Sequence, residues 1–165
     1  MINDKKIKIR EASLRDLESV AELKLKLGKH ERRFDKEMKI LPKRTIVTYL
    51  KKDVLGKNKG KIFVAVDESI RRIVGYCIGW IDSGDWPWIE YRGLRAGYIC
   101  DCFVLDKYRR RGIGSSLVKE MLKWLKSRKI KITHLGVYSR NKRAYNAWKS
   151  VGFRELEITM RKVVR

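Results

Sequence analysis

The residues with the clearest chemical use lie in the stretch YRRRGIGSSL, Tyr108 to Leu117, where a run of arginines meets a Gly-x-Gly turn. The first backbone N–H groups of a helix have no carbonyl partner and point along the positive end of the helix dipole. Glycine lets an anion approach this backbone because no Cβ stands in the way. A helix that begins near Ile113 would therefore present the amides of residues 110–115 to a phosphate.

Two common nucleotide-binding patterns do not fit this turn. It lacks the Gly-Lys-Ser/Thr of an ATP-binding P-loop, and the third glycine of a dinucleotide fingerprint would fall at Leu117. The turn therefore disfavours both nucleotide hydrolysis and hydride transfer.

The turn resembles the cofactor motif of the GNAT family of N-acetyltransferases. Arg109-x-x-Gly112-x-Gly114, preceded by FVLDKY, is similar to that family's R/Q-x-x-G-x-G/A motif. A second block, HLGVYSRNKRAYNAWKSVGF, is similar to the family's strand, Asn-containing helix start and closing Gly-Phe. The matching residues of that block are Val137, Asn141, Ala144, Trp148, Gly152 and Phe153. The resemblance covers about residues 6–163.

The resemblance implies acetyl-CoA as cosubstrate and direct attack of an acceptor amine on the thioester. It assigns the pyrophosphate to the turn, at Arg109, Arg110, Arg111, Gly112, Ile113, Gly114 and Ser115. The pantetheine arm would lie between the strands DCFV and LGVYS, along the backbone of Cys102, Phe103 and Val104, and would contact Asn141. An N–H near Val104 would polarise the acetyl carbonyl, as in an oxyanion hole.

The general acid is where the family pattern breaks. Many members use a Tyr on the last helix to protonate the departing thiolate, and Trp148 stands at the matching position. An indole N–H is no useful acid. Tyr145 lies one turn earlier on the helix and is either a substitute acid or a packing aromatic.

Two residues on one predicted strand are candidates for the base that deprotonates the amine. Family members place a base at positions matching Gly136, Tyr98 or Cys100, and of these only Tyr98 is suited to the task. Asp101 is the one carboxylate of that strand, and burial would raise its pKa toward a useful value. Strand alternation places Tyr98, Cys100 and Cys102 on one face and Asp101 on the other unless a bulge intervenes.

The segment DSGDWPWIEY follows the third predicted strand, near the family's acceptor site. Its aromatic residues Trp86, Trp88 and Tyr91 either frame a cationic acceptor, drawn by nearby carboxylates, or form a hydrophobic lid.

The pattern of apolar residues, caps and turns predicts the elements that must position these groups. Strands are predicted over 6–12, 61–67, 73–81, 96–105, 132–139 and 153–163. Helices are predicted from about residue 14, over 44–55, over 112–129 and over 141–152. This order gives an α/β (α+β mixed) fold in a single domain, residues 1–165. The resemblance implies a GNAT-like fold with a central mixed, largely antiparallel sheet flanked by helices and with strands splayed at the cofactor site.

The net charge of +22 is concentrated in the last third, where residues 106–165 carry 18 basic and 4 acidic side chains, a balance of +14. Such a field attracts polyanions. The alternative function is therefore a nucleic-acid-associated protein, either an RNA binder on this fold or an acetyltransferase of RNA or aminoacyl-tRNA. Otherwise the acceptor is a protein N-terminus, a lysine or a small amine.

The remaining sequence features concern location and partners. The N-terminus is charged and lacks an apolar signal region, and no apolar run could span a membrane, so we expect a cytoplasmic protein, monomeric or homodimeric. The three cysteines, Cys77, Cys100 and Cys102, make a poor metal or disulfide set, so we expect no metal and reduced thiols.

Overall fold

The computed structural model describes residues 6–56, 60–82 and 95–164. Its helices and strands follow the predicted order as far as residue 150. In chain order they are β1 (Ile7–Glu11), a 3-10 turn (Leu14–Asp16), α1 (Leu17–Glu31), α2 (Lys43–Tyr49), a π-helical turn (Leu50–Leu55), β2 (Gly60–Asp67), β3 (Arg72–Asp82), β4 (Ala96–Val104), a second 3-10 turn (Asp106–Tyr108), α3 (Ile113–Ser127), β5 (Ile132–Leu135) and α4 (Lys142–Ser150).

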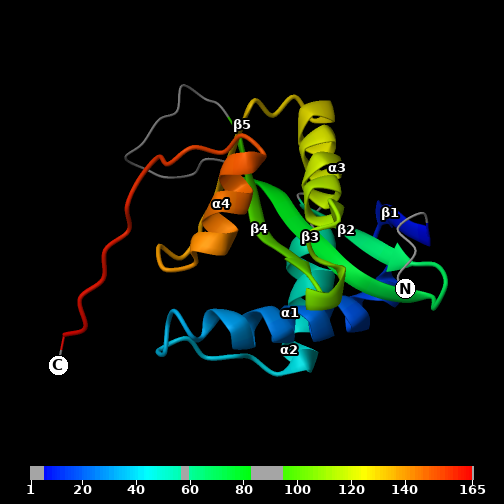
Figure 1. The fold of residues 1–165 in the computed structure, drawn as a ribbon, viewed down its shortest axis with the longest axis horizontal. Coiled ribbons are helices and arrows are strands. Elements are labelled where there is room, and N and C mark those ends of the chain that lie inside the picture. The colour runs from blue at the N-terminus through cyan, green and yellow to red at the C-terminus, as the bar shows by residue number, and fades with distance from the viewer. Residues whose placement is uncertain (1–5, 57–59, 83–94, 165) are drawn as a thin grey trace.

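The five strands form one sheet in the order β1-β2-β3-β4-β5 (Figure 1). The strands from β1 to β4 pair antiparallel, and β5 joins β4 in parallel after the crossover through α3. The predicted fold class, a mixed and largely antiparallel sheet flanked by helices, is confirmed.

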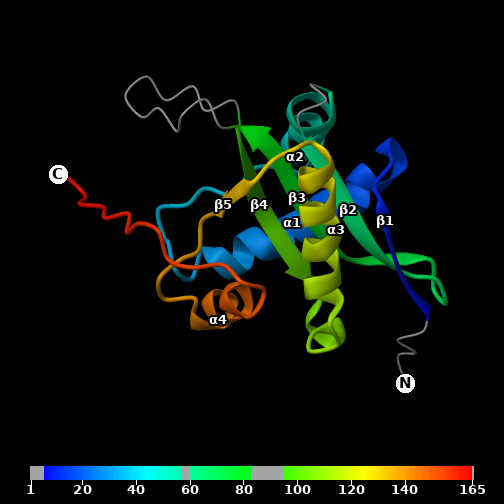
Figure 2. The ribbon, with the colours of Figure 1, turned by 90° about the horizontal axis from the view of Figure 1, so that it is seen from above.

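Helices cover both faces of the sheet, with α1 and the π-helical turn against one face, α2 packed on α1, and α3 against the other face (Figures 1 and 2). The core on the α1 side includes Val20, Leu50 and Ile78, and the core on the α3 side includes Leu117 and Met121, all fully buried. The helix α3 packs in this way because its buried side chains recur every three or four residues along one face. None of the helices in the described ranges is long and apolar enough to cross a membrane.

The strands β4 and β5 separate after a short stretch of pairing. Their register runs only from Ala96↔Ile132 to Ile99↔Leu135. Beyond that point β4 continues to Val104 whereas β5 has ended, so within the described chain the second half of β4 has no strand on its β5 side. Figure 2 shows the two strands diverging, with α4 on the β5 side of the opening. The splayed strands are therefore present.

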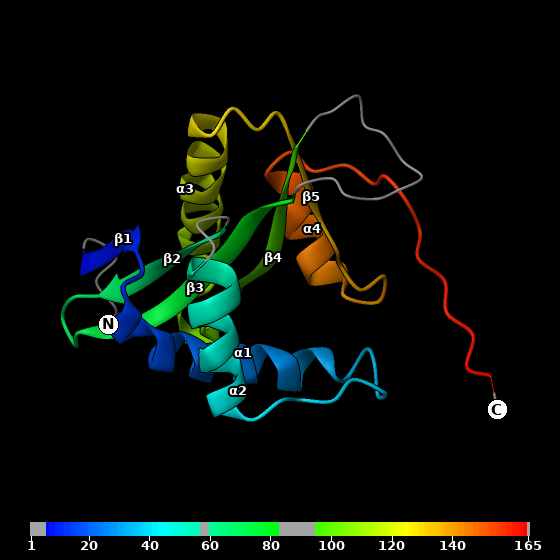
Figure 3. The same ribbon diagram turned by 180° about the vertical axis from the view of Figure 1, so that it is seen from behind.

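The strand predicted over residues 153–163 is wrong. Residues 153–164 have no regular secondary structure and run away from the sheet (Figures 1 and 3). Their alternating apolar side chains remain in solvent, with Leu156 70%, Ile158 87% and Met160 89% exposed. Alternation favours a strand only where a neighbouring strand supplies hydrogen bonds, and no described strand pairs with this segment.

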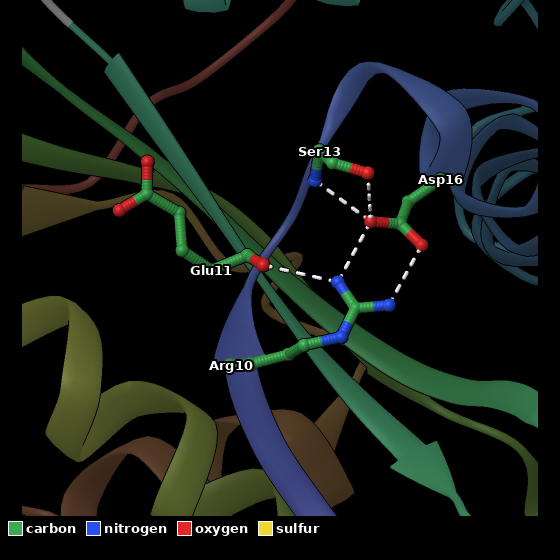
Figure 4. Close-up of polar contacts among 4 residues, drawn as sticks. All are labelled: Arg10, Glu11, Ser13 and Asp16. Carbon is green, nitrogen blue, oxygen red and sulfur yellow. Dashed lines mark hydrogen bonds and ion pairs between the residues drawn. The ribbon is translucent and has the colours of Figure 1, made fainter.

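Polar contacts at the start of α1 fix this helix to β1 (Figure 4). Arg10 of β1 donates two hydrogen bonds to the Asp16 carboxylate, at 2.7 and 2.9 Å. The backbone N–H and the hydroxyl of Ser13 donate to the same carboxylate, at 2.7 and 2.9 Å. The Arg10 guanidinium, together with these Ser13 hydrogen bonds, holds the pKa of Asp16 well below its ordinary value. The contacts orient α1 where it leaves β1 to cross the sheet.

Candidate active site

The turn between β4 and α3 has the backbone geometry of an anion site. Arg110 and Gly112 both adopt the left-handed conformation, with φ of 62° and 75°. The helix α3 begins at Ile113, as predicted, and Ser116 N–H donates to the Gly112 carbonyl at 2.9 Å. The amides of residues 113–115 precede this helical ladder and lie at the positive end of the helix. Left-handed residues beside such amides form a concave backbone arrangement that binds anions.

The surroundings of the turn also suit an anion. Nothing in the described structure lies within 4 Å of the position that a Cβ on Gly112 would take. The first turn of α3 carries no acidic side chain that would repel a phosphate. The turn is therefore open to a ligand and electrostatically favourable to negative charge.

The three arginines of the turn have different surroundings. The Nε of Arg109 donates to the Val104 carbonyl at 2.7 Å, and its guanidinium forms an ion pair with Asp106 at 2.7 Å. The side chain of Arg111 lines a small pocket of about 120 Å³ beside β1. Arg110 is exposed. Arg109 therefore braces the turn through its contacts with β4, whereas Arg111, like Arg110, is exposed.

A basic pocket of about 450 Å³ opens on the α1 side of the same turn. Its lining residues are Lys26, His30, Arg72, Phe103, Leu105, Asp106, Lys107 and Arg109. Burial, and then the charges of Arg33, Arg109 and Arg143, lower the pKa of His30. The positive potential around the turn therefore comes from α1 and α4 as well as from the turn itself.

The backbone of β4 alternates between the β3 side and the opening. Leu105 N–H donates to the Val74 carbonyl at 2.9 Å and so points toward β3. In an antiparallel ladder the direction alternates with each residue. The polar backbone groups of Phe103 therefore point toward β3, while those of Cys102 and Val104 point into the opening between β4 and β5. Cys102 and Val104 are thus the positions at which an extended ligand could pair with β4.

A β-bulge in β4 reverses part of the predicted pattern of faces. The register passes from Ile78↔Asp101 to Gly79↔Ile99, so Cys100 is an extra residue without a partner on β3. A bulge of this kind places two consecutive side chains on the same side of the sheet. The strict alternation predicted for this strand therefore holds only on each side of Cys100.

The bulge brings Tyr98 and Asp101 onto one face, the face that α1 covers. Tyr98 contacts Trp80 on that side, with ring centroids 5.2 Å apart, and Asp101 forms an ion pair with Lys24 of α1. Cys100 packs into the core on the α1 side and Cys102 into the core on the α3 side. The expectations that Asp101 lies opposite Tyr98, and that the two cysteines share a face, are both wrong because the bulge adds one residue.

A cluster of charged side chains lies beneath the bulge. Burial lowers the pKa of Lys24, but the neighbouring Asp101 outweighs this effect, and the net pKa is raised. Burial and the Asp101 charge raise the pKa of Glu31 to about 7, although Lys24 opposes the shift. Burial, followed by the Asp101 charge, raises the pKa of the Cys100 thiol to about 12. The cluster therefore contains one carboxyl group poised to exchange a proton near neutral pH.

Tyr98 lies where β4 and β5 begin to separate. Its hydroxyl lies close to the backbone of Gly136, just after β5, since a Cβ on Gly136 would sit 3.5 Å from the phenol oxygen. Burial, with smaller contributions from Cys100 and Asp101, raises the pKa of the hydroxyl. Tyr98 is therefore a neutral phenol at pH 7, able to donate a hydrogen bond but unsuited to removing a proton.

The predicted residues of the last helix are distributed along α4. Asn141 caps the helix, with its Oδ1 accepting a hydrogen bond from Ala144 N–H at 3.2 Å, so its NH2 group is what it can offer a ligand. Tyr145 lies between two ammonium groups, those of Lys142 and Lys149, at 5.9 and 5.4 Å from its ring centroid. Among the described residues, no hydrogen bond, ion pair or ring contact joins Tyr145 to Tyr98 or Asp101.

Trp148 packs against the core on the α3 side and meets Phe153 edge to face, with ring centroids 5.6 Å apart. Gly152 ends the helix region in the left-handed conformation, with φ of 97°, as predicted. The indole is thus a packing residue of α4.

Sequence reasoning missed Lys24 and Glu31. The signal was their spacing, because they are seven residues apart and follow the buried positions Leu17 and Val20 at helical intervals. Two charges therefore occupy core-facing positions of α1. The alternating appearance of LKLKLGKH concealed this pattern. The candidate acceptor residues Trp86, Trp88 and Tyr91 lie outside the described residues.

The sequence profile described as the acetyltransferase (GNAT) family matches residues 25–153. The chain belongs to this family. As a GNAT protein it is an acetyltransferase that uses acetyl-CoA. No curated protein matches the sequence significantly.

Solved structures share this GNAT fold over nearly the whole chain. A mutant of the BH1408 protein from Bacillus halodurans is 25% identical, with a TM-score of 0.82 over 96% of this chain and 99% of that one. A possible acetyltransferase from Clostridium difficile 630 is 24% identical, with a TM-score of 0.73 over 96% and 97%. The aminoglycoside N-acetyltransferase AAC(6')-Iy, in complex with CoA, is 16% identical, with a TM-score of 0.74 over 96% and 95%.

The residues present fit the CoA moiety that GNAT proteins use. The amides of residues 113–115 and the left-handed Arg110 and Gly112 provide an anion cradle for a pyrophosphate. The unpaired half of β4 offers the backbone of Cys102 and Val104 to an amide-containing arm. Both features adjoin the same opening. Within the described ranges, no group of His, Cys, Asp or Glu side chains is arranged to hold a metal ion.

Proposed function

We propose that this protein transfers the acetyl group of acetyl-CoA to the nitrogen of a primary amine. The observation that carries the proposal is the position of the anion-binding turn beside the unpaired half of β4. A pyrophosphate held on residues 113–115 would direct the attached arm along Cys102 and Val104. The thioester would then lie near the bulge, where Tyr98 and Asp101 face α1.

The chain's own groups supply what acetyl transfer to an amine requires. Acetyl-CoA, when bound, supplies an activated acetyl thioester. The N–H groups of Cys102 and Val104 point into the opening, and that of Cys102, which is nearer the bulge, is placed to polarise the acetyl carbonyl, which is the role of an oxyanion-hole donor. Asn141 offers an NH2 group beside the arm. A thiolate is a good leaving group, so the reaction does not depend on a strong acid at the position of Trp148.

The acceptor side carries negative charge in an otherwise basic protein. Asp101 and Glu31 lie on the α1 face, close to the end of the proposed acetyl path. A cationic amine would be attracted to these carboxylates and oriented toward the thioester. This charge arrangement favours an amine over an anionic acceptor such as nucleic acid at the point of reaction.

The test is acetyl transfer from labelled acetyl-CoA into three acceptor pools. The pools are peptides with free N-termini and lysines, small amines including aminoglycosides, and tRNA. We expect label in the peptide or small-amine pool and none in tRNA. Incorporation into tRNA would favour the nucleic-acid alternative, and no incorporation into any pool, with acetyl-CoA still bound, would overturn amine acetylation.

A further inference from the structure

Glu31 occupies an unusual place at the end of α1. It lies seven residues after Lys24, on the same side of the helix, and Lys24 contacts Asp101 of β4. Glu31 lies near Asp101 of β4 and near Tyr138, which follows β5, since its charge interacts with both groups. The carboxyl group of Glu31 is therefore close to β4 and to the segment after β5, which border the opening.

The groups that face Glu31 come from all the elements around it. They are Lys24 of α1, Tyr76 of β3, Cys100 and Asp101 of β4, and Tyr138 after β5. Among these, only Lys24 is cationic, and its ammonium group is in direct contact with Asp101. Within the described chain the Glu31 carboxyl group has no ion pair or hydrogen bond of its own. The site thus has two carboxylates for one fixed cation, and a second cation would complete it.

An inference about the reaction follows, and it rests on the amine acetylation proposed above. We propose that Glu31 is the catalytic base, which accepts a proton from the ammonium group of an acceptor bound between Glu31 and Asp101. The acceptor is accordingly a primary amine that arrives protonated and binds as a second cation beside the two carboxyl groups.

The proton balance of the step is complete. The bound R–NH3⁺ gives one proton to the Glu31 carboxylate and becomes R–NH2. Its nitrogen lone pair then forms the C–N bond to the acetyl carbon as the C–S bond breaks. The second proton leaves the nitrogen for the departing thiolate, giving the amide and CoA–SH. Glu31 finally releases its proton to solvent, which regenerates the carboxylate.

The other candidates in the cluster are less suited to removing the proton. Asp101 already has the Lys24 ammonium as a direct partner, whereas Glu31 has no such partner among the described residues. The raised pKa of Tyr98 keeps the phenol protonated, so it can donate a hydrogen bond only. The raised pKa of Glu31 lies close to neutral pH, where a general base is most effective.

The test compares three variants in acetyl transfer to n-propylamine, a lysine-containing peptide and spermidine. Glu31→Gln removes the base at equal size, Glu31→Asp keeps a carboxylate, and Glu37→Gln is a matched charge control at an exposed position after α1. We expect Glu31→Gln to lower kcat/KM for the amine by about 10²- to 10⁴-fold while acetyl-CoA affinity is unchanged. Glu31→Asp should retain part of the rate, and Glu37→Gln should match the wild type.

The pH profile and NMR separate this role from a structural one. The wild-type rate should rise with a midpoint near pH 7, and this limb should be absent in Glu31→Gln. The ¹³C signal of the Glu31 carboxyl should titrate near the same pH, and Asp101→Asn should lower that midpoint because a neighbouring negative charge is lost. Wild-type activity with an unchanged rate and profile in Glu31→Gln would overturn the role of Glu31 alone. Absence of transfer to any amine by the wild type would overturn the proposed function, and this inference with it.

Discussion

At the scale of single residues, two carboxyl groups in one cluster have been given different environments. Asp101 contacts the Lys24 ammonium, whereas Glu31 is half-buried without such a partner and has its pKa raised to about 7. Environments that separate the behaviour of neighbouring carboxyl groups are how proteins assign proton-transfer roles. In the proposed reaction, the proton-accepting role therefore falls to Glu31, while Asp101 keeps its contact with Lys24.

The raised pKa of Glu31 predicts a pH-dependent cost to stability. Because burial disfavours the charged form, the wild type loses stability relative to the Glu31→Gln variant as the pH rises from the ordinary value of 4.5 through about 7. We expect Glu31→Gln to raise the free energy of unfolding at pH 8 by about 1–2 kcal/mol, after allowance for solvent screening. The difference should vanish at about pH 4.5. Urea denaturation at the two pH values measures it, and an equal difference at both would contradict the burial argument.

The sequence predicted some of these residues and missed others for a physical reason. The positions of Gly112 and Ile113 follow from local backbone rules, since a left-handed residue before a helix start is a short-range pattern. The cluster of Lys24, Glu31 and Asp101 is formed by contacts between distant segments, and no local rule brings α1 beneath β4. Even so, the sequence alone shows that Lys24 and Glu31 lie at the helical spacing of the buried residues of α1, where charged side chains are unexpected.

At the scale of elements, acetyl-CoA binding at the turn before α3 should depend more on the charge than on the size of the side chain at position 112. Gly112 has a left-handed backbone, which Asn and Asp tolerate better than other residues. We expect Gly112→Asp to abolish detectable acetyl-CoA binding, because it places a carboxylate among the amides that we propose hold the pyrophosphate. Gly112→Asn, of nearly equal size but uncharged, should retain much of the affinity. Calorimetric titration of both variants with CoA measures the difference, and equal losses would show that only backbone shape matters.

The start of α1 should depend on the Asp16 carboxylate. Asp16→Asn removes the charge that Arg10 and Ser13 bind, and should lower the free energy of unfolding by about 1–3 kcal/mol at pH 7. Because the pKa of Asp16 is lowered in the fold, this contribution is complete above its ordinary value of 3.8 and is lost as the pH falls further. Chemical denaturation from pH 7 to pH 2 follows the loss.

Glu18→Gln is the matched control for that experiment. Glu18 forms an exposed ion pair with Lys43 at 3.0 Å, a contact worth less than about 1 kcal/mol. If Glu18→Gln lowered the free energy of unfolding as much as Asp16→Asn, the hydrogen bonds of Asp16 at the helix start would contribute no more than an exposed ion pair.

Two elements show where sequence patterns stop being informative. The bulge at Cys100 arises from pairing with β3, so a strand read alone appears to alternate without interruption. The segment 153–163 has an alternating pattern as clear as that of β1, yet no described strand borders it and it stays extended in solvent. A pattern of side chains specifies which face could be buried, whereas pairing depends on a partner elsewhere in the chain.

At the scale of the whole molecule, the net charge of +22 should govern how fast the cofactor arrives. Positive groups from α1, the turn and α4 surround the site, so a polyanionic ligand is steered toward it. We expect the association rate of acetyl-CoA to fall by about tenfold or more between about 0.02 and 0.3 M salt, with a smaller change in the dissociation rate. Stopped-flow binding measures both rates.

CoA that lacks its 3'-phosphate is the control for steering. It carries less charge, so its association rate should depend less steeply on salt. Equal slopes for the two ligands would mean that the basic surface acts elsewhere, for example on nucleic acid. The fold class and the family were predictable at this scale because they rest on the order of elements and on a local motif, whereas the proposed acceptor site draws on side chains of α1, β3 and β4 and of the segment after β5.

The bulge in β4 also decides whether even- or odd-numbered residues face α1. Up to and including Cys100, even-numbered residues such as Tyr98 face α1. Beyond Cys100, odd-numbered residues such as Asp101 and Phe103 face it. Deleting Cys100 would make side chains alternate between the two faces of the sheet along the whole of β4. In one half of the strand, the side chains that now face α1 would then face α3, and the reverse. A library intended to reshape acceptor preference should therefore vary even positions up to Cys100 and odd positions beyond it, and comparisons with relatives of different bulge length should be shifted by one residue at this point.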